Sequence, residues 1–289
     1  METRIKRGIT AAMAVAATTA AVLVGLGGSG SAAGSADGLR AYGITANGRS
    51  LLTFTTDDPT VNDWVRAVTG LSVDTALIGI DFRVQDRLLY GVGNHGGVYT
   101  ISIPGAVLKK VSQLSVPLQG SVYGVDFNPA ANRLRVISDT GQNLRHNIDD
   151  GSGAGTTIVD KPLTNSPSTA TATGVTAAAY TNNDLNSDTG TTLFDLNTVS
   201  DQVVIQSPAN DGLLVPTGRL GPDAGSNAGF DIFSKLTNGK TTALSAFAVL
   251  MLTDGSATFY TVDLLTGAAS AVGEFPLPVG DIAVALDGS

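Results

Sequence analysis

The stretch GVDFNPAANRLRVISDTGQNLRHN, residues 124–147, reads as three short strands separated by two turns. Apolar residues alternate with polar ones in 124–127 and through most of 133–138, as expected of strands with one buried face. The connecting segments NPAAN and DTG are rich in residues that favour turns. TTIVD, residues 156–160, adds a further strand, so this region predicts a unit of four short strands.

Relatives of this unit recur along the chain. The motif GVDF has counterparts that begin, together with it, at Gly79, Gly124, Gly174, Gly229 and, by position only, Asp281. These starts differ by 45, 50, 55 and 52 residues. A second series of strand-and-turn segments interleaves with the first and begins at Leu51, Val98, Leu144, Leu193 and Phe259. In the fourth unit, the same pattern predicts GVTA as the first strand and AAAYTN, residues 177–182, as the second.

Four antiparallel strands repeated at roughly 40–50 residues predict an all-β fold, a β-propeller. A single twisted sheet cannot bury both of its apolar faces, whereas blades stacked around an axis cover one another. We expect five four-stranded blades, with the GVDF-type motifs as innermost strands and their glycines where the backbones crowd the axis. An open pair of β-sandwiches or a β-solenoid are the alternatives.

The two ends of the chain complement each other. The first unit, made of LRAYGIT (39–45), LLTFTT (51–56) and WVRAVTGL (64–71), has no innermost strand before it. The last innermost strand, DIAVAL (281–286), has no partner strands after it. We therefore expect the C-terminal strand to complete the N-terminal blade and to close the ring without a disulfide.

Several long segments resemble domain-of-unknown-function family 4394, a group of exported bacterial proteins: GIDFRVQDRLLYGVGNHGGVYTIS, VYGVDFNPAANRLRVISDTGQNLRHN, AAYTNN, TTLFDLNTVSDQVVIQSPANDGLL and AGFDI. The resemblance runs over nearly all of residues 39–286, and its most specific piece is 126–145. It implies a β-propeller-like domain and brings no established activity or catalytic residues. Residues 234–257 look atypical and are interpreted as an insertion.

The first 36 residues have the pattern of a secretory signal peptide. A basic segment with Arg4, Lys6 and Arg7 precedes an apolar run, and the small-residue stretch SGSAAGSA follows. Cleavage is expected after Ala33 or Ala36, which leaves 37–289 as a single secreted domain. An uncleaved membrane anchor is the alternative, because the run approaches spanning length.

Charge and composition narrow the possible partners. The chain carries 17 basic and 25 acidic residues, and removal of 1–36 would leave a net charge of −10. Without a basic stripe, nucleic acid and anionic membranes are not expected partners. The absence of cysteine excludes disulfides, thiolate catalysis and Cys-ligated metals. We expect a monomer that binds an unidentified protein or glycan, with no cofactor other than a possible calcium ion.

Hydrolase chemistry has little support in the sequence, which contains no G-x-S-x-G motif. His95 lies in a glycine-rich turn and His146 in a strand, and both are expected to be exposed. Asp81, Asp126 and Asp231 hold equivalent positions in three innermost strands. If they face the channel, they could serve acid–base glycoside chemistry or bind a cation. Alternatively, each accepts hydrogen bonds from a neighbouring blade and joins the blades.

A polar hairpin and an acidic loop are the remaining candidates. The hairpin could bind an acidic ligand or a sugar, or could lock two blades together, through Arg133, Arg135, Asp139, Gln142, Asn143 and Arg145. The loop DLNSDTGTTLFD resembles a calcium loop with Asp184, Asn186, Asp188 and Asp195, although its glycine is in the seventh place instead of the sixth. Trp64, the only tryptophan, is expected to pack within a blade.

Taken together, these patterns favour a non-catalytic binding or scaffold module. The rival hypothesis is a carbohydrate-active hydrolase or lyase that uses the channel carboxylates with Arg135 or Arg145. A third possibility is a structural extracellular protein stabilised by calcium.

Overall fold

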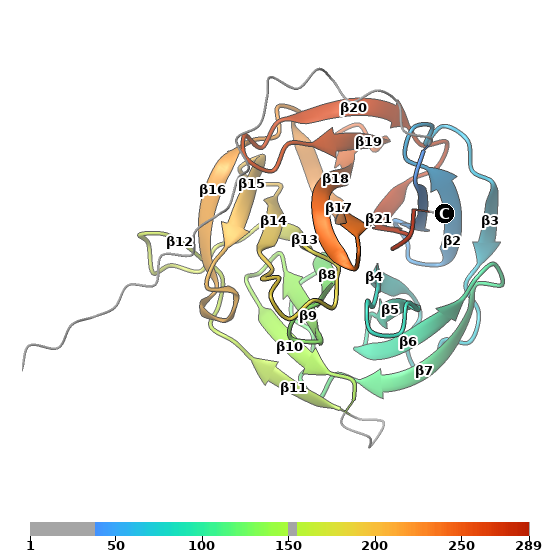
Figure 1. The fold of residues 1–289 in the computed structure, drawn as a ribbon, viewed down its shortest axis with the longest axis horizontal. Helices are drawn as coiled ribbons and strands as arrows, with labels where there is room; N and C mark the ends of the chain where they lie inside the picture. Colours follow the sequence, from blue (N-terminus) through green and yellow to red (C-terminus); the bar gives the residue numbers. More distant parts are fainter. Residues whose placement is uncertain (1–37, 150–154, 289) are drawn as a thin grey trace, which may run out of the picture. The chain divides into compact units, whose positions relative to one another are not determined.

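The computed structural model describes residues 38–149 and 155–288, which form five sheets arranged as the blades of a propeller around one axis (Figure 1). The sheets are antiparallel apart from one short parallel pairing, of residues 164–165 with 213–214. The predicted signal peptide lies outside the described residues. Within them, the one helical element is the 3-10 turn η1 (Ala209–Asp211), and no helix is long and apolar enough to cross a membrane.

Every blade runs from an innermost strand at the axis to an outer strand at the rim. Blade I consists of β21 (Val279–Val284), β1 (Arg40–Thr45), β2 (Ser50–Thr55) and β3 (Trp64–Ala67). Blade II consists of β4 (Leu77–Phe82), β5 (Leu89–Gly93), β6 (Gly97–Ser102) and β7 (Val107–Gln113). Blade III consists of β8 (Tyr123–Asn128), β9 (Arg133–Ser138), β10 (Asn143–Asn147) and β11 (Thr156–Val159). Blade IV consists of β13 (Val175–Tyr180), β14 (Leu193–Asn197), β15 (Gln202–Gln206), β16 (Leu213–Arg219) and the short β12 (Thr164–Asn165). Blade V consists of β17 (Ala224–Thr237), β18 (Lys240–Leu252), β19 (Ala257–Val262) and β20 (Ala269–Glu274).

The ring closes through blade I. Strand β21, at the C-terminal end, pairs antiparallel with β1, with Tyr42 opposite Ala283 and Gly43 opposite Ile282. Figure 1 shows the red end of the chain beside the blue beginning of the propeller. The predicted closure is confirmed, and backbone hydrogen bonds hold the two ends together.

The apolar core is divided among the five seams, a seam being the interface between two neighbouring blades. One buried cluster lies at each seam. At the V–I seam, for example, Phe54 of blade I meets Phe259 of blade V edge-on, with ring centroids 5.2 Å apart. Trp64 packs beside Tyr42, as expected, in the cluster at the I–II seam. Each blade therefore depends on both neighbours to bury its two faces.

Blade IV corrects the strand assignment made from the sequence. GVTA and AAAYTN are not two strands, because residues 175–180 form the single innermost strand β13. The second strand is β14, and the outer strand is β16, which the sequence pattern did not predict. The alanine-rich run gave too weak an alternation to mark one strand, and Pro216 in β16 is unusual except at a sheet edge.

The glycines of the innermost strands sit where neighbouring backbones come close. A Cβ at Gly124 would lie 2.7 Å from the backbone of Ala177, and one at Gly229 would lie 2.5 Å from the Cα of Asp281. Gly79 is similarly crowded by Val125. Gly174 differs from the expectation, because it precedes β13 and has a φ of +78°, which makes it a turn residue.

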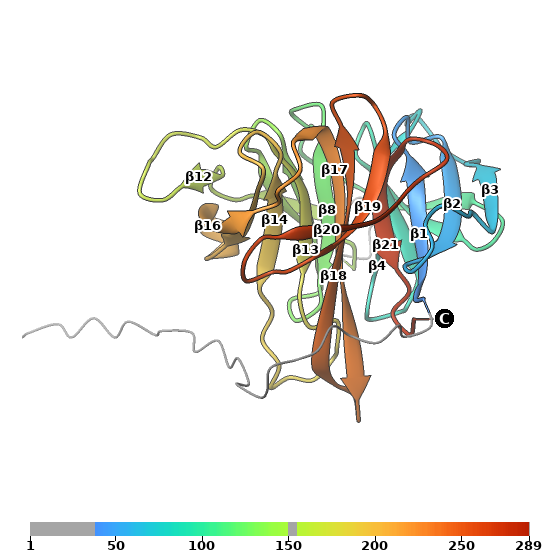
Figure 2. The same cartoon turned by 90° about the horizontal axis from the view of Figure 1, so that it is seen from above.

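The atypical segment 234–257 lengthens one hairpin. Strands β17 and β18 have 14 and 13 residues and project beyond the other blades (Figure 2). The loop between β13 and β14 contacts this hairpin, since Asp184 accepts hydrogen bonds from the amide and the hydroxyl of Thr241, at 2.8 and 2.7 Å. The insertion is thus an ordered part of blade V.

Crowding at the axis makes a direct prediction. Gly124→Ala should lower the free energy of unfolding by about 2–4 kcal/mol, because the new Cβ meets a neighbouring backbone that cannot rotate away. Gly190→Ala is the matched control, since a Cβ there meets nothing within 4 Å. Chemical denaturation of both variants measures the difference, and equal stability would contradict the close approach of β8 and β13.

Candidate functional site

Four aspartates of the innermost strands lie at the axis and are almost fully buried. Asp81 Oδ2 on β4 accepts the Phe127 amide of the next blade, at 2.8 Å. Asp231 Oδ2 on β17 accepts the Val284 amide, at 2.5 Å, and Asp281 Oδ2 on β21 accepts the Ile80 amide, at 2.8 Å. Each side chain therefore joins its innermost strand to that of a neighbouring blade. For Asp81 and Asp231, this is the blade-joining alternative described in the sequence analysis.

Asp126 continues the same pattern from blade III to blade IV, where it interacts with the Tyr180 backbone amide. Tyr180 is thus the residue of blade IV that is equivalent to Phe127 of blade III. The residue before it, Ala179, is therefore at the position that is aspartate in blades II, III and V. In blade I, Ala283 occupies that position, and Asp281 lies two residues earlier. The motif pattern missed Asp281 as a site residue because its register differs from that of the other three.

Burial dominates the electrostatics of this axial cluster. It raises the pKa of Asp126 well above the usual range, and the nearby charges of Asp81 and Asp231 raise it further. Burial also raises the pKa of Asp81 well above its usual value, and that of Asp231 to about 6. The pKa of Asp281 is raised well above the usual range for the same reason.

Geometry limits what this cluster can do chemically. Carboxylate oxygens of Asp81, Asp126 and Asp231 lie within 4.8 Å of one another. Three ionised carboxylates at this spacing would repel strongly, so the group either retains protons at neutral pH or shares its charge with a hard, oxygen-liganded cation. Each residue is only 3–5% exposed, so a substrate would have to enter the axis to reach them.

The polar hairpin of blade III locks onto blade IV. Arg135 is 3% exposed, and its guanidinium donates to Asp160 Oδ2 and Asn143 Oδ1, at 2.8 and 2.7 Å. It also reaches blade IV, where it donates to Tyr180 Oη and Asn210 Oδ1, at 3.2 and 2.8 Å. Of these partners, only Asn143 belongs to the predicted set. Asp160, Tyr180 and Asn210 are distant in sequence and carry no motif.

Of the four remaining hairpin candidates, one contacts this cluster and three do not. Arg145 joins it through Asp160 Oδ1, at 2.9 Å. Arg133 instead donates to the nearby carbonyl of Asn132, at 2.7 Å. Asp139 accepts the Ser121 amide, and Gln142 bonds the Gln119 amide and the Pro117 carbonyl. The side chains of Asp139 and Gln142 therefore fix the loop that leads into blade III.

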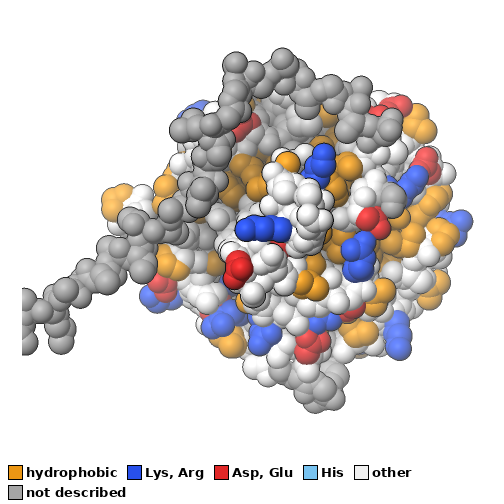
Figure 3. Space-filling view, in the orientation of Figure 1, with side chains coloured by type: hydrophobic (Ala, Val, Ile, Leu, Met, Phe, Trp, Pro, Cys, Tyr) orange, Lys and Arg blue, Asp and Glu red, His pale blue; other side chains and the backbone are white. Residues whose placement is uncertain are grey.

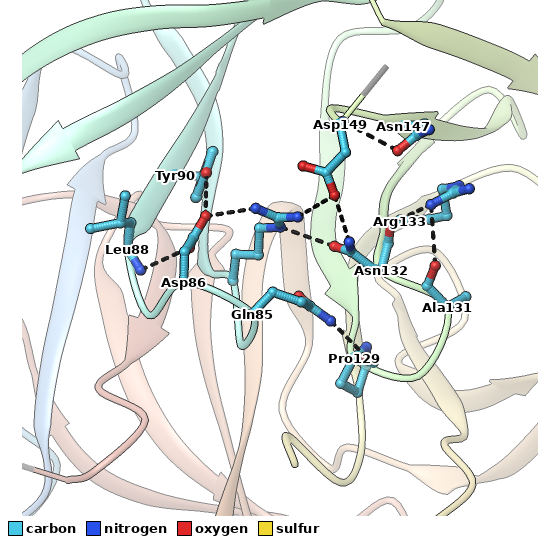
Figure 4. Close-up of polar contacts among 11 residues, drawn as sticks. Gln85, Asp86, Leu88, Tyr90, Pro129, Ala131, Asn132, Arg133, Asn147 and Asp149 are labelled. Carbon is cyan, nitrogen blue, oxygen red and sulfur yellow. Dashed lines mark hydrogen bonds and ion pairs between the residues drawn. The ribbon is translucent and has the colours of Figure 1, made fainter. Parts of the chain in front are cut away.

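A second polar lock joins blades II and III near the ends of their innermost strands (Figure 4). Arg83, which is buried, donates to Asp86 at 2.6 Å, to Asp149 at 2.5 Å and to Asn132 Oδ1 at 3.0 Å. Asp86 also accepts the hydroxyl of Tyr90, at 2.7 Å. The sequence pattern did not single out Arg83, whose partners come from two blades.

The two histidines differ in environment. His95 is exposed, as expected. The expectation that His146 is exposed is wrong, because it is 0% exposed at the II–III seam. Its Nε2 lies 2.8 Å from Ser112 Oγ and its Nδ1 lies 2.9 Å from Thr157 Oγ1. Strand alternation alone could not reveal that a neighbouring blade covers this face.

The acidic loop is used for local structure and for bracing. Asp184 Oδ1 accepts the Asn186 amide, and Asn186 Oδ1 accepts the Asp188 amide, at 3.0 and 2.9 Å. Asp188 is exposed. Asp195 lies on β14, away from the loop turn, and is 0% exposed. Among the described residues, the clustered group of acidic or histidine ligands is the axial one of Asp81, Asp126 and Asp231.

The fold and the axial cluster define a five-bladed β-propeller with a closed, acidic axis. The family model described as domain of unknown function (DUF4394) matches residues 50–283, so the chain belongs to this family. A search of curated proteins found no relative of this sequence.

Solved structures resemble this chain weakly. A protein of unknown function from Bacteroides thetaiotaomicron is 14% identical, with a TM-score of 0.45, and the match covers 87% of this chain and 68% of that one. A putative 6-phosphogluconolactonase from Bacteroides uniformis is 12% identical, with a TM-score of 0.40 and 83% of each chain covered. Hydrazine synthase from Kuenenia stuttgartiensis is 12% identical, with a TM-score of 0.39, and covers 71% of this chain. This chain spans only 51% of that one.

The raised pKa values predict an unusual pH dependence. The ordinary aspartate pKa is 3.8, and burial raises that of folded Asp231 to about 6. This difference corresponds to about 3 kcal/mol of unfolding free energy that is lost when the group ionises. Ionisation therefore favours the unfolded chain, and stability present below pH 4 is lost as the pH rises through the folded values. Denaturation curves between pH 4.5 and 8 should show stability falling with pH, and Asp126→Asn should flatten the slope. A rise in stability over this range would contradict the burial of uncompensated carboxyls.

The Arg135 lock makes a separate prediction. Arg135→Ala should cost about 3–5 kcal/mol of unfolding free energy, because it leaves Asp160 buried with fewer partners. Arg133→Ala is the matched control and should change stability by less than about 0.5 kcal/mol. If urea titrations gave the two variants equal midpoints, Arg135 would not hold blades III and IV together.

Proposed function

We propose that this domain is an exported, non-catalytic module that binds a protein partner on a rigid propeller scaffold. One observation carries the proposal: the candidate catalytic groups are committed to joining blades. The axial carboxylates accept amides of neighbouring strands, and Arg135 is buried among polar groups of two blades. Groups in such roles have little freedom to exchange partners with a substrate during a reaction.

Export rests on the sequence of residues 1–36, with its basic start, apolar run and small-residue end. The net charge of −10 that remains after their removal suits a soluble module outside the cell. A chain without cysteine is also insensitive to the redox state of the medium.

The proposed binding surface is the hairpin platform, defined as the projecting ends of β17 and β18 with the loop 182–192. Asp184 and Asn183 brace it, the latter through a 2.9 Å hydrogen bond from its amide to Ser234 Oγ. It presents Leu185, Leu236 and Leu244, which are 63%, 39% and 39% exposed. Braced, exposed aliphatic side chains favour a protein partner. Figure 3 shows charges of both signs interspersed with hydrophobic side chains on the described surface of one face.

A crosslinking experiment on the secreted protein tests this proposal. The mature chain should begin at Gly34 or Asp37, and a photo-crosslinking residue at Asn238 should attach to one protein of the cell surface or medium. The matched control is the same residue at Leu265, which is 61% exposed on another turn. Leu236→Glu combined with Leu244→Glu should remove the crosslink and leave the circular dichroism spectrum unchanged.

Equal attachment from both positions, attachment only to glycan, or a crosslink that survives the double substitution would contradict the platform as the binding surface. Turnover of a carbohydrate that is lost in a folded Asp126→Asn variant would contradict the non-catalytic role.

A further inference from the structure

Blade IV carries three buried oxygen atoms whose hydrogen-bonding capacity is unmet. Asp195 is 0% exposed, and among the described residues neither of its carboxylate oxygens has a hydrogen-bond partner. Gln206 is 1% exposed, and its Oε1 likewise has none. The amide of Gln206 cannot simply be reversed, because Nε2 already donates to Asn143 Oδ1 and to the Ala209 carbonyl. Gln206 Oε1 can only accept, and the Asp195 carboxyl keeps at least one accepting oxygen in either protonation state, so this place needs hydrogen-bond donors.

Strand register places these acceptors together. Asp195 pairs with Val204, and Leu193 pairs with Gln206. The side chains of Asp195 and Gln206 therefore lie on the same face of blade IV, in successive pairs on that face. Leu193 and Val204 belong to the cluster that also contains Ile137 of blade III, which shows that this face packs against blade III. The acceptors therefore lie at the III–IV seam.

The fold itself does not require a carboxyl at this position. In the other four blades, the residues that correspond to Asp195 in the pairing of the two innermost strands are Gly43, Gly91, Val136 and Ala248. An aspartate at an otherwise small or apolar core position indicates a local polar partner, because a carboxyl buried alone is costly.

Charge on the opposite side of the seam identifies the kind of partner. Arg135 and Arg145 both bond Asp160, so this cluster has one more positive than negative charge. Burial raises the pKa of Asp195, and the charge of Arg135 acts against this effect. An ionised Asp195 would balance the cluster, whereas a cation bound to Asp195 would restore the excess positive charge. A neutral hydrogen-bond donor therefore fits better than a metal ion.

We propose that the III–IV seam contains a buried hydration site, in which ordered water joins the Asp195 carboxylate and Gln206 Oε1 to the Arg135 cluster. A water molecule donates two hydrogen bonds and also accepts, so it can bridge Gln206 Oε1 and one Asp195 oxygen while it accepts a hydrogen bond from the Arg135 cluster. Buried water typically makes about three hydrogen bonds to groups of this kind. The site lies between blades III and IV, and its carboxyl has no counterpart at the corresponding positions of the other four blades.

A high-resolution crystal structure of the secreted protein tests the site directly. We expect density for water at about 2.6–3.2 Å from an Asp195 oxygen and from Gln206 Oε1. Carboxylate oxygens packed only against apolar side chains, or bonded directly to a shifted protein donor, would overturn the proposal.

Thermal unfolding supplies an independent test that does not depend on crystals. Asp195→Val copies the residue of blade III and should lower Tm by about 5 °C, because it removes the bridging water and leaves the Gln206 oxygen unserved. Asp195→Asn should lower Tm less, and Asp188→Asn, at an exposed loop position, should leave it unchanged. A rise in Tm for Asp195→Val would show that the carboxyl had no partner.

The same melts distinguish water from an ion. Sodium, potassium or calcium chloride should shift Tm equally in the wild type and in Asp195→Asn. A cation that stabilises the wild type alone would overturn the hydration site in favour of a metal site.

Discussion

At the axis of this propeller, a carboxyl oxygen on one innermost strand accepts a hydrogen bond from a backbone amide of the next. Asp281 bonds Ile80, Asp81 bonds Phe127, and Asp231 bonds Val284, while Asp126 faces the Tyr180 amide in the same way. Blades IV and V are joined differently, by Asn183 and Asp184 against the long hairpin of blade V. Because each blade relies on its neighbours to cover its apolar faces, these bonds set the spacing on which all five core clusters depend.

This arrangement carries an electrostatic cost. Four carboxyls buried together disfavour ionisation, and the amide hydrogen bonds offset only part of that effect. Raised pKa values are also found at catalytic sites, so the direction of the shift does not by itself distinguish catalysis from structure. Their repetition from blade to blade, each with a backbone amide as partner, favours the structural role. The seams outside the axis use Arg83 and Arg135, each bonded to groups from two blades.

The sequence predicted the architecture better than the sites. Strong alternation and regular turns were sufficient for blades I, II, III and V and for closure by the last strand. Blade IV was misassigned because Ala177, Ala178 and Ala179 give no clear alternation, although they form one buried strand. The repeated aspartates could be found from their motif. Asp281, Arg83 and the partners of Arg135 could not, because their roles depend on contacts between blades that no local pattern encodes. His146 was placed wrongly for the same reason.

The axial carboxyls join the blades and should retain protons at neutral pH. Infrared spectroscopy of the folded protein at pH 7 tests it most directly, through the C=O stretching band of protonated carboxyl groups. We expect such a band in the wild type, a weaker one in Asp126→Asn, and no change on addition of a chelator. Fully ionised axial carboxylates, with no difference between the wild type and the variant, would contradict it.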